Sequence, residues 1–157
     1  MQPDALIAAA TARGLTIACA ESLTGGAVAS ALVAVPGASD AVAGGVVAYT
    51  IAAKVRVLGV NAAIIEDYGV VSEEVALAMA RRARELFGAS AGVGTTGVAG
   101  PASHGGKPAG TVCVASVGPA GEFATTAVHG GDRAAVREHA VGDALALLAL
   151  ALGETVA

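Results

Sequence analysis

The sequence predicts an α/β protein, a three-layer α/β/α sandwich built on a mixed, mostly parallel sheet. Short apolar segments of strand length alternate with helix-like segments through the first half of the chain. Two more strand-like segments then follow each other across the turn Gly118-Pro119-Ala120-Gly121, a pattern typical of a hairpin. The 157 residues are 55% hydrophobic and only 14% charged, which suits one packed core. We therefore expect a single domain over residues 1–157.

Glycine and proline divide the first half of the chain into its elements. A first helix stops at Gly14, and the almost wholly apolar segment after it has the length of a buried strand. Pro36-Gly37 ends a second helix, and Gly59 ends a short third one. The expected elements are a helix over 3–12, a strand over 15–20, a helix over 27–35, a strand over 41–51 and a helix over 52–58.

Capping residues mark the helices of the second half. Ser72 precedes Glu73 and Glu74, so a helix beginning there has an N-cap hydroxyl and two acids in its positive first turn. Asp132 is expected to cap the last helix, which stops at Gly153. The expected elements are a helix from 73 with apolar residues at 75, 79, 83 and 86, strands over 89–95, 111–117 and 122–129, and a helix over 132–152.

Composition excludes several classes of protein. The net charge is −4 at pH 7 and no run of Lys or Arg occurs, so a general nucleic-acid binder is not expected. No apolar run approaches the ~20 residues of a spanning helix. The N-terminus carries Asp4 and no basic region, unlike a signal peptide. We expect a cytoplasmic protein that binds neither nucleic acid nor membrane.

Cysteine and histidine positions give no sign of a metal site. Cys19 and Cys113 lie in apolar, strand-like segments, as buried reduced thiols do. His104, His129 and His139 have no metal-ligand spacing with either cysteine. We therefore expect no metal and no cofactor.

The stretch Gly92-Val93-Gly94-Thr95-Thr96-Gly97 has the G-x-G-x-x-G spacing of a dinucleotide-binding turn. That turn must open a helix, and the glycines and prolines of residues 100–108 forbid one there. An NAD(P)-linked reductase is therefore not favoured. Two readings remain for the loop: its backbone and the hydroxyls of Thr95 and Thr96 bind an anion or an amide, or it is a plain connection.

A stronger indication of chemistry lies in residues 20–26, AESLTGG. A buried strand ends here and a helix begins, which places Ser22 on the turn between them. This is the setting of a nucleophile elbow, although the G-x-S-x-G pattern is absent. The alternative is that Ser22 or Thr24 only caps the helix.

A serine nucleophile needs a base, and Lys54 is the main candidate. It follows Tyr49, at the end of the second expected strand, and lies among alanines and valines. A lysine desolvated in this way has a lowered pKa and can act as the base of a Ser–Lys hydrolase. The alternative is a solvated surface lysine.

Seven ordered segments carry a resemblance to a known family. They are AESLTGG (20–26), VPGAS (35–39), GGVVAYTIAAK (44–54), GVVSEEVALAMA (69–80), TTGVAGP (95–101), KPAGTVCVA (107–115) and GDRAAVREHAV (131–141). Over nearly its whole length the chain resembles the C-terminal domain of the CinA proteins, which also occurs alone as nicotinamide-nucleotide amidase. Without the larger domain that often precedes it, no pyrophosphatase activity is expected.

The resemblance implies hydrolysis of the carboxamide of nicotinamide mononucleotide to nicotinate mononucleotide and ammonia. By this resemblance Ser22 is the nucleophile, Lys54 its base, and Tyr49 positions or relays the proton. Arg133 and Arg137 are expected to meet the 5′-phosphate. The other expected substrate-binding residues are Glu21, Thr24, Gly25, Gly26, Thr96, Gly97, Ala99 and Gly100.

The chain departs from the family pattern at three places. Leu23 stands where the family usually has Cys, Thr50-Ile51 where Ser-Asn is common, and the loop after Pro101 carries His104. Leu23 and Ile51 favour the alternative, a non-catalytic nucleotide-binding or interaction domain that keeps the fold, whereas the presence of Ser22, Tyr49 and Lys54 together favours an enzyme. The expected partner is a small pyridine mononucleotide, and the apolar helices favour a homo-oligomer, a dimer above all.

Overall fold

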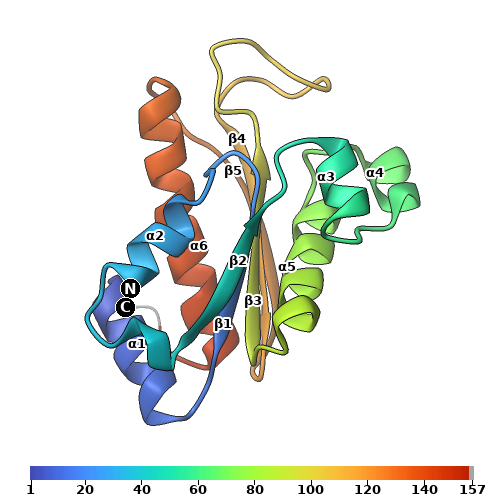
Figure 1. Ribbon diagram of the computed structural model, residues 1–157. Coiled ribbons are helices and arrows are strands. Elements are labelled where there is room, and N and C mark those ends of the chain that lie inside the picture. The colour runs from blue at the N-terminus through green and yellow to red at the C-terminus, as the bar shows by residue number, and fades with distance from the viewer. Residues whose placement is uncertain (156–157) are drawn as a thin grey trace.

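The computed structural model describes residues 1–155, so the last two residues of the expected domain lie outside the described residues. It contains one five-stranded sheet in the order β2-β1-β3-β4-β5, with helices on both faces (Figure 1). The elements are α1 (Pro3–Ala12), β1 (Ile17–Glu21), α2 (Ala27–Val33), the 3₁₀ helix η1 (Ala38–Asp40), β2 (Val42–Val47), α3 (Ile51–Arg56), α4 (Ala62–Tyr68), α5 (Glu73–Phe87), β3 (Ala91–Gly97), β4 (Thr111–Gly118), β5 (Gly121–Val128) and α6 (Arg133–Leu152).

The strand directions confirm a mixed sheet. β1 is parallel to both β2 and β3, whereas β4 is antiparallel to β3 and β5. Four strands thus run in one direction, and β4 runs against them. The carboxyl ends of β1, β2 and β3 therefore meet at one edge, which is where open α/β sheets hold ligands.

The helices form the two outer layers of the sandwich. Figure 1 shows α1, α2 and α6 against one face of the sheet and α3, α4 and α5 against the other. Leu6, Leu32 and Leu148 are buried in the first layer, and Leu58 and Met79 in the second. No helix within the described part of the chain combines the length and apolar character needed to cross a membrane.

Local capping explains where several elements begin. The side chains of Ser72 and Asp132 accept hydrogen bonds from the backbone N–H groups of Val75 and Ala135, as expected. The second strand ends at Val47, not at residue 51, because the Thr50 side chain caps α3. Helix α4 was not expected from the sequence.

The glycines of the G-x-G-x-x-G stretch serve packing. A Cβ atom on Gly92 would lie 2.1 Å from the carbonyl oxygen of Ala80, and one on Gly94 would lie 2.2 Å from that of Ala76. These two glycines therefore allow α5 to approach β3 closely. Gly92 and Gly94 thus contact a helix and not a ligand, and only the end of the stretch reaches the loop after β3.

Candidate active site

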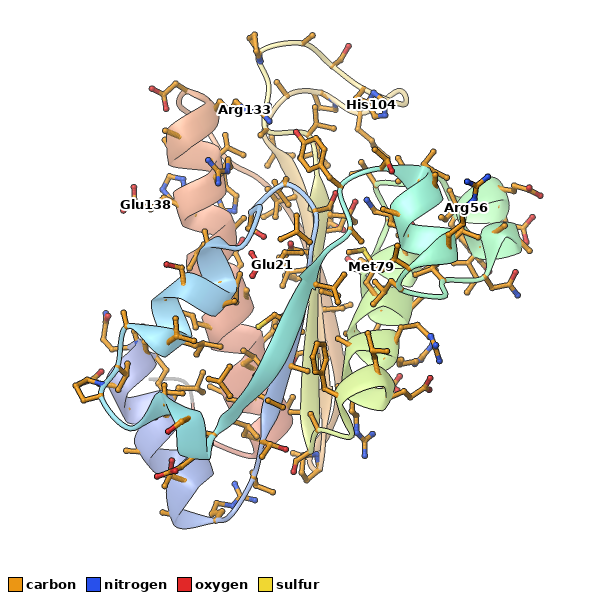
Figure 2. All side chains as sticks on the ribbon, in the orientation of Figure 1. Glu21, Arg56, Met79, His104, Arg133 and Glu138 are labelled. Atoms are coloured by element: carbon orange, nitrogen blue, oxygen red, sulfur yellow. The ribbon has the colours of Figure 1, made fainter. Side chains whose placement is uncertain are left out.

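A cavity of about 730 Å³ opens at the carboxyl end of the parallel strands. Its lining includes Ser22 after β1, Lys54 in α3, the residues that follow β3, and Arg133 in the first turn of α6. Figure 2 shows His104, in the loop after β3, and Arg133 at this end of the molecule. The volume lies within the range of small-molecule sites.

Ser22 lies immediately after β1, on the turn that leads to α2. The N-cap of α2 is Gly26, with no side-chain cap hydrogen bond, so neither Ser22 nor Thr24 caps this helix. The backbone N–H of Ser22 donates to the carbonyl oxygen of Thr95 over 3.1 Å. Its Oγ accepts a hydrogen bond of 2.8 Å from Lys54 Nζ. The reading of Ser22 as a helix cap is therefore wrong.

Lys54 is a buried lysine, only 1% exposed. Besides Ser22, its Nζ donates to the carbonyl oxygen of Ala48 at 2.8 Å and, more weakly, to that of Tyr49 at 3.5 Å. Among the ion pairs of the described residues none involves Lys54. Burial lowers its pKa from 10.5 to about 8, because desolvation disfavours the charged ammonium. The alternative of a solvated surface lysine is thus excluded.

The Tyr49 side chain lies at the rim of the cavity. It is 57% exposed, and its hydroxyl accepts a 2.8 Å hydrogen bond from Arg133. A second N–H of Arg133 donates to the carbonyl oxygen of Gly100 at 2.9 Å. Tyr49 therefore faces Lys54 through its backbone carbonyl, while its hydroxyl is joined to Arg133.

The end of β3 and the loop after it form one wall. Thr96, Gly97, Ala99 and Gly100 line the cavity, as expected for substrate-binding residues. The Thr96 hydroxyl donates to the carbonyl oxygen of Val70 over 2.8 Å. Sequence reasoning missed Val70 and Val71 as lining residues, because neither belongs to a recognisable polar motif.

Glu21 has a different place from the one expected. Its carboxylate accepts hydrogen bonds from the backbone N–H groups of Gly26 at 2.9 Å, Val28 at 3.1 Å and Ala29 at 2.8 Å. The buried carboxylate of Glu21 thus caps the N-terminal end of α2. Glu21, Gly25 and Gly26 are not among the described residues that line the cavity.

Thr24 and Arg137 also lie behind the cavity wall. The Thr24 hydroxyl is 2.8 Å from that of Thr95. Arg137 donates from Nε to the carbonyl oxygen of Leu23 and from a terminal nitrogen to that of Thr24, both at 2.9 Å. Neither Thr24 nor Arg137 is part of the described cavity lining.

All three departures from the family pattern lie on the cavity, which Leu23, Thr50, Ile51 and His104 help to line. Leu23 is 4% exposed and belongs to the hydrophobic core, while it also borders the cavity. Ile51 lies at the rim and is 51% exposed. Leu23 is therefore a packing residue beside Ser22, and Ile51 gives the rim an apolar side chain.

The charged side chains of the cavity are of one sign. Lys54 and Arg133 line it, together with His104, and no carboxylate occurs among its described lining residues. Such a cavity favours an anionic ligand. Within residues 1–155, no three His, Cys, Asp or Glu side chains are grouped as a metal site would require.

Comparison with known proteins agrees with this arrangement. The model of the CinA C-terminal domain matches residues 2–152. The chain belongs to the CinA C-terminal domain family. A CinA-like protein of Anaeromyxobacter sp. (strain K) is 52% identical over 153 residues, which are 96% of this chain and 37% of that relative. The chain thus spans little more than a third of the relative's length.

Solved structures of the family have the same fold. The competence-damaged protein (CinA) superfamily protein ECK1530/EC0983 from Escherichia coli is 36% identical, with a TM-score of 0.91 over 95% of this chain and 87% of that one. The competence/damage inducible protein CihA from Agrobacterium tumefaciens is 35% identical, with a TM-score of 0.89 over 98% and 97% of the two chains. The three-layer α/β/α fold expected from the sequence is thereby confirmed.

Proposed function

We propose that this protein hydrolyses the carboxamide of nicotinamide mononucleotide to nicotinate mononucleotide and ammonia through a serine acyl-enzyme. The observation that carries the proposal is the hydrogen bond between buried Lys54 and Ser22 at the cavity. With a pKa of about 8, Lys54 has a neutral fraction near pH 7 that can take the serine proton.

In the first half of the reaction, Ser22 Oγ attacks the carboxamide carbon while its proton passes to Lys54 Nζ. The tetrahedral oxyanion needs backbone donors, and the Leu23 N–H has no acceptor among the described residues. The C–N bond then breaks, and ammonia leaves with the proton held by Lys54.

In the second half, water attacks the ester carbonyl carbon and Lys54 accepts a proton from it. The ester C–O bond breaks, Ser22 Oγ regains its proton from Lys54, and the nicotinate product leaves as the carboxylate after its acid proton passes to solvent. The positive pyridinium ring of the substrate withdraws electrons from the acyl carbon, so both attacks are eased by the substrate itself.

The rest of the cavity suits a mononucleotide. Arg133 carries a planar cation at the rim, which matches a phosphate geometrically. Thr96, Gly97, Ala99 and Gly100 supply a wall of small groups for the ring and the ribose. We assign the 5′-phosphate to Arg133, with the Tyr49 hydroxyl holding its guanidinium.

The test is ammonia release from nicotinamide mononucleotide by the wild type beside Ser22→Ala. We expect turnover in the wild type and none above background in the variant, whose fold loses one hydrogen bond worth about 1 kcal/mol. Retained activity in Ser22→Ala contradicts the covalent mechanism. Binding of the mononucleotide without ammonia release by the wild type identifies a binding domain instead.

A further inference from the structure

The guanidinium of Arg137 donates hydrogen bonds to the backbone of the turn that carries Ser22. It lies on α6, one turn after Arg133, and donates to the carbonyl oxygens of two consecutive residues, Leu23 and Thr24. Both distances are 2.9 Å. The rigid fork of an arginine can bridge two adjacent carbonyls in this way, whereas a lysine presents a single point charge.

Glu21 holds the backbone that follows the same turn. Its carboxylate accepts three backbone N–H groups from the start of α2, and the side chain is 1% exposed. Figure 2 shows Glu21 in the interior of the molecule. The carboxylate of Glu21 therefore binds backbone donors after the turn, while the guanidinium of Arg137 binds two backbone carbonyl oxygens within it.

The turn itself has no regular secondary structure to fix it. Residues 22–26 lie between the end of β1 and the start of α2. Ser22 Oγ meets Lys54 Nζ at 2.8 Å only while this turn keeps its shape. An error of about 1 Å in such a position is enough to lower a catalysed rate about 10²-fold.

We propose that Arg137 is a positioning residue, which clamps the Leu23 and Thr24 carbonyls so that Ser22 Oγ stays in line with Lys54 Nζ. The inference rests on the proposed function only in taking Ser22 as the nucleophile. The two arginines, which are one helical turn apart, then have different roles. Arg133 faces the cavity and the substrate phosphate, and Arg137 acts through the protein backbone.

The experiment compares Arg137→Gln, Arg137→Lys and the matched control Glu138→Gln. Glu138 is exposed, and Figure 2 shows it pointing away from the sheet. Two readouts are taken: the rate at which a small fluorophosphonate labels Ser22, followed by intact mass, and kcat and KM for ammonia release. Each rate is corrected for the folded fraction, measured by circular dichroism at the assay temperature.

For Arg137→Gln we expect both the labelling rate and kcat to fall about 10²-fold, with KM within about twofold of wild type. Arg137→Lys is expected to recover part of the loss, since one ammonium can hold one of the two carbonyls. Glu138→Gln should behave as wild type. If Arg137→Gln does not fold, the Arg137→Lys rates decide, with an expected loss of about tenfold.

Two results overturn the proposal. If the Arg137 variants are labelled at the wild-type rate, Arg137 has only a structural role. If KM rises for nicotinamide mononucleotide, while KM for nicotinamide riboside and the labelling rate stay unchanged, Arg137 binds the substrate phosphate. If the wild type is labelled but releases no ammonia, the proposed substrate fails, while slower labelling of the Arg137 variants still supports the positioning role.

Discussion

The two ends of the sheet are built from different chemistry. Buried polar side chains gather at the carboxyl end of the parallel strands, where Lys54 and Glu21 are each 1% exposed. At the opposite end, where β1 begins and α6 finishes, the buried side chains are mostly apolar, with Ile17, Leu148 and Leu152 at 0–1% exposure. The polar exception there is Ser116, whose hydroxyl donates to the carbonyl oxygen of Gly92. The polar residues at the first end are Glu21, Ser22, Thr24, Lys54, Thr95, Thr96 and Thr111.

The difference shows that the polar end lowers the stability of the folded protein, because it buries a charged group. Every buried side-chain nitrogen or oxygen among the described residues has a hydrogen-bond partner, so the polar end is fully bonded. A bonded but unpaired ammonium is still less stable there than in water, which is why the pKa of Lys54 falls to about 8. Apolar packing is thus concentrated at one end of the sheet, and the proposed active site lies at the other.

The largest expected effect is that of Lys54→Met. We expect kcat to fall about 10³-fold because the base is lost, while the melting temperature near pH 7 stays the same or rises as a desolvated charge is removed. Steady-state kinetics and calorimetry measure the two quantities. Lys107→Met, at an exposed lysine, is the control. A melting temperature that drops sharply with activity retained would mean that Lys54 is structural.

A substitution at the apolar end should have the reverse profile. Leu148 is fully buried, so Leu148→Ala leaves a cavity in the core and is expected to lower the free energy of unfolding by about 2–5 kcal/mol. The kcat per folded molecule should remain that of wild type. Urea denaturation and kinetics at low temperature check both, and a loss of kcat larger than the loss of folded protein would show that the two ends are coupled.

The packing role of the glycine stretch predicts a smaller loss. Gly94→Ala puts a methyl group 2.2 Å from the Ala76 carbonyl oxygen and should lower the free energy of unfolding by about 1–3 kcal/mol. Gly142→Ala, on α6 with open space around it, is the matched control and should raise it by up to about 1 kcal/mol. Equal effects at both positions would contradict the packing explanation.

The smallest expected effect is the pH dependence of the wild type. With a Lys54 pKa of about 8, about a tenth of the base is neutral at pH 7 and about half at pH 8. We therefore expect kcat/KM to rise about fivefold over that unit and to level off above pH 9. A flat profile from pH 6 to 9 would contradict a lysine base.

The same pKa has a consequence for stability. Burial lowers the pKa of Lys54 from 10.5 to about 8, so the unfolded chain binds more protons than the native protein between these values. Lys54 thus makes the free energy of unfolding rise with pH across this window. Denaturation at pH 8 and pH 10 should show that contribution in the wild type and not in Lys54→Met.

Local patterns in the sequence were sufficient for most of the fold. Ser72 and Asp132 mark helix starts because capping depends on neighbouring residues alone. Helix α4 was missed, since its seven residues carry no acidic first turn and are too short for a clear apolar period. The glycine spacing could not reveal whether a helix or a ligand occupies the space beside each glycine.

The candidate site was predictable only in part from the sequence. Ser22 and Lys54 could be named as candidates from their own surroundings, a strand-to-helix turn and an apolar segment, while a helix cap and a surface lysine stayed open as alternatives. Arg133 and Arg137 could not be told apart, because their different contacts arise from where α6 meets the turn after β1. Cytoplasmic location and dimer formation remain predictions from composition.

The most direct test of the account is to trap the acyl-enzyme. Wild-type protein is mixed with nicotinamide mononucleotide, quenched in acid within one turnover, and mapped by peptide mass spectrometry. We expect an ester adduct on the peptide that contains Ser22, absent from Ser22→Ala and formed far more slowly in Lys54→Met. Ammonia release at full rate with no adduct on Ser22 would contradict it.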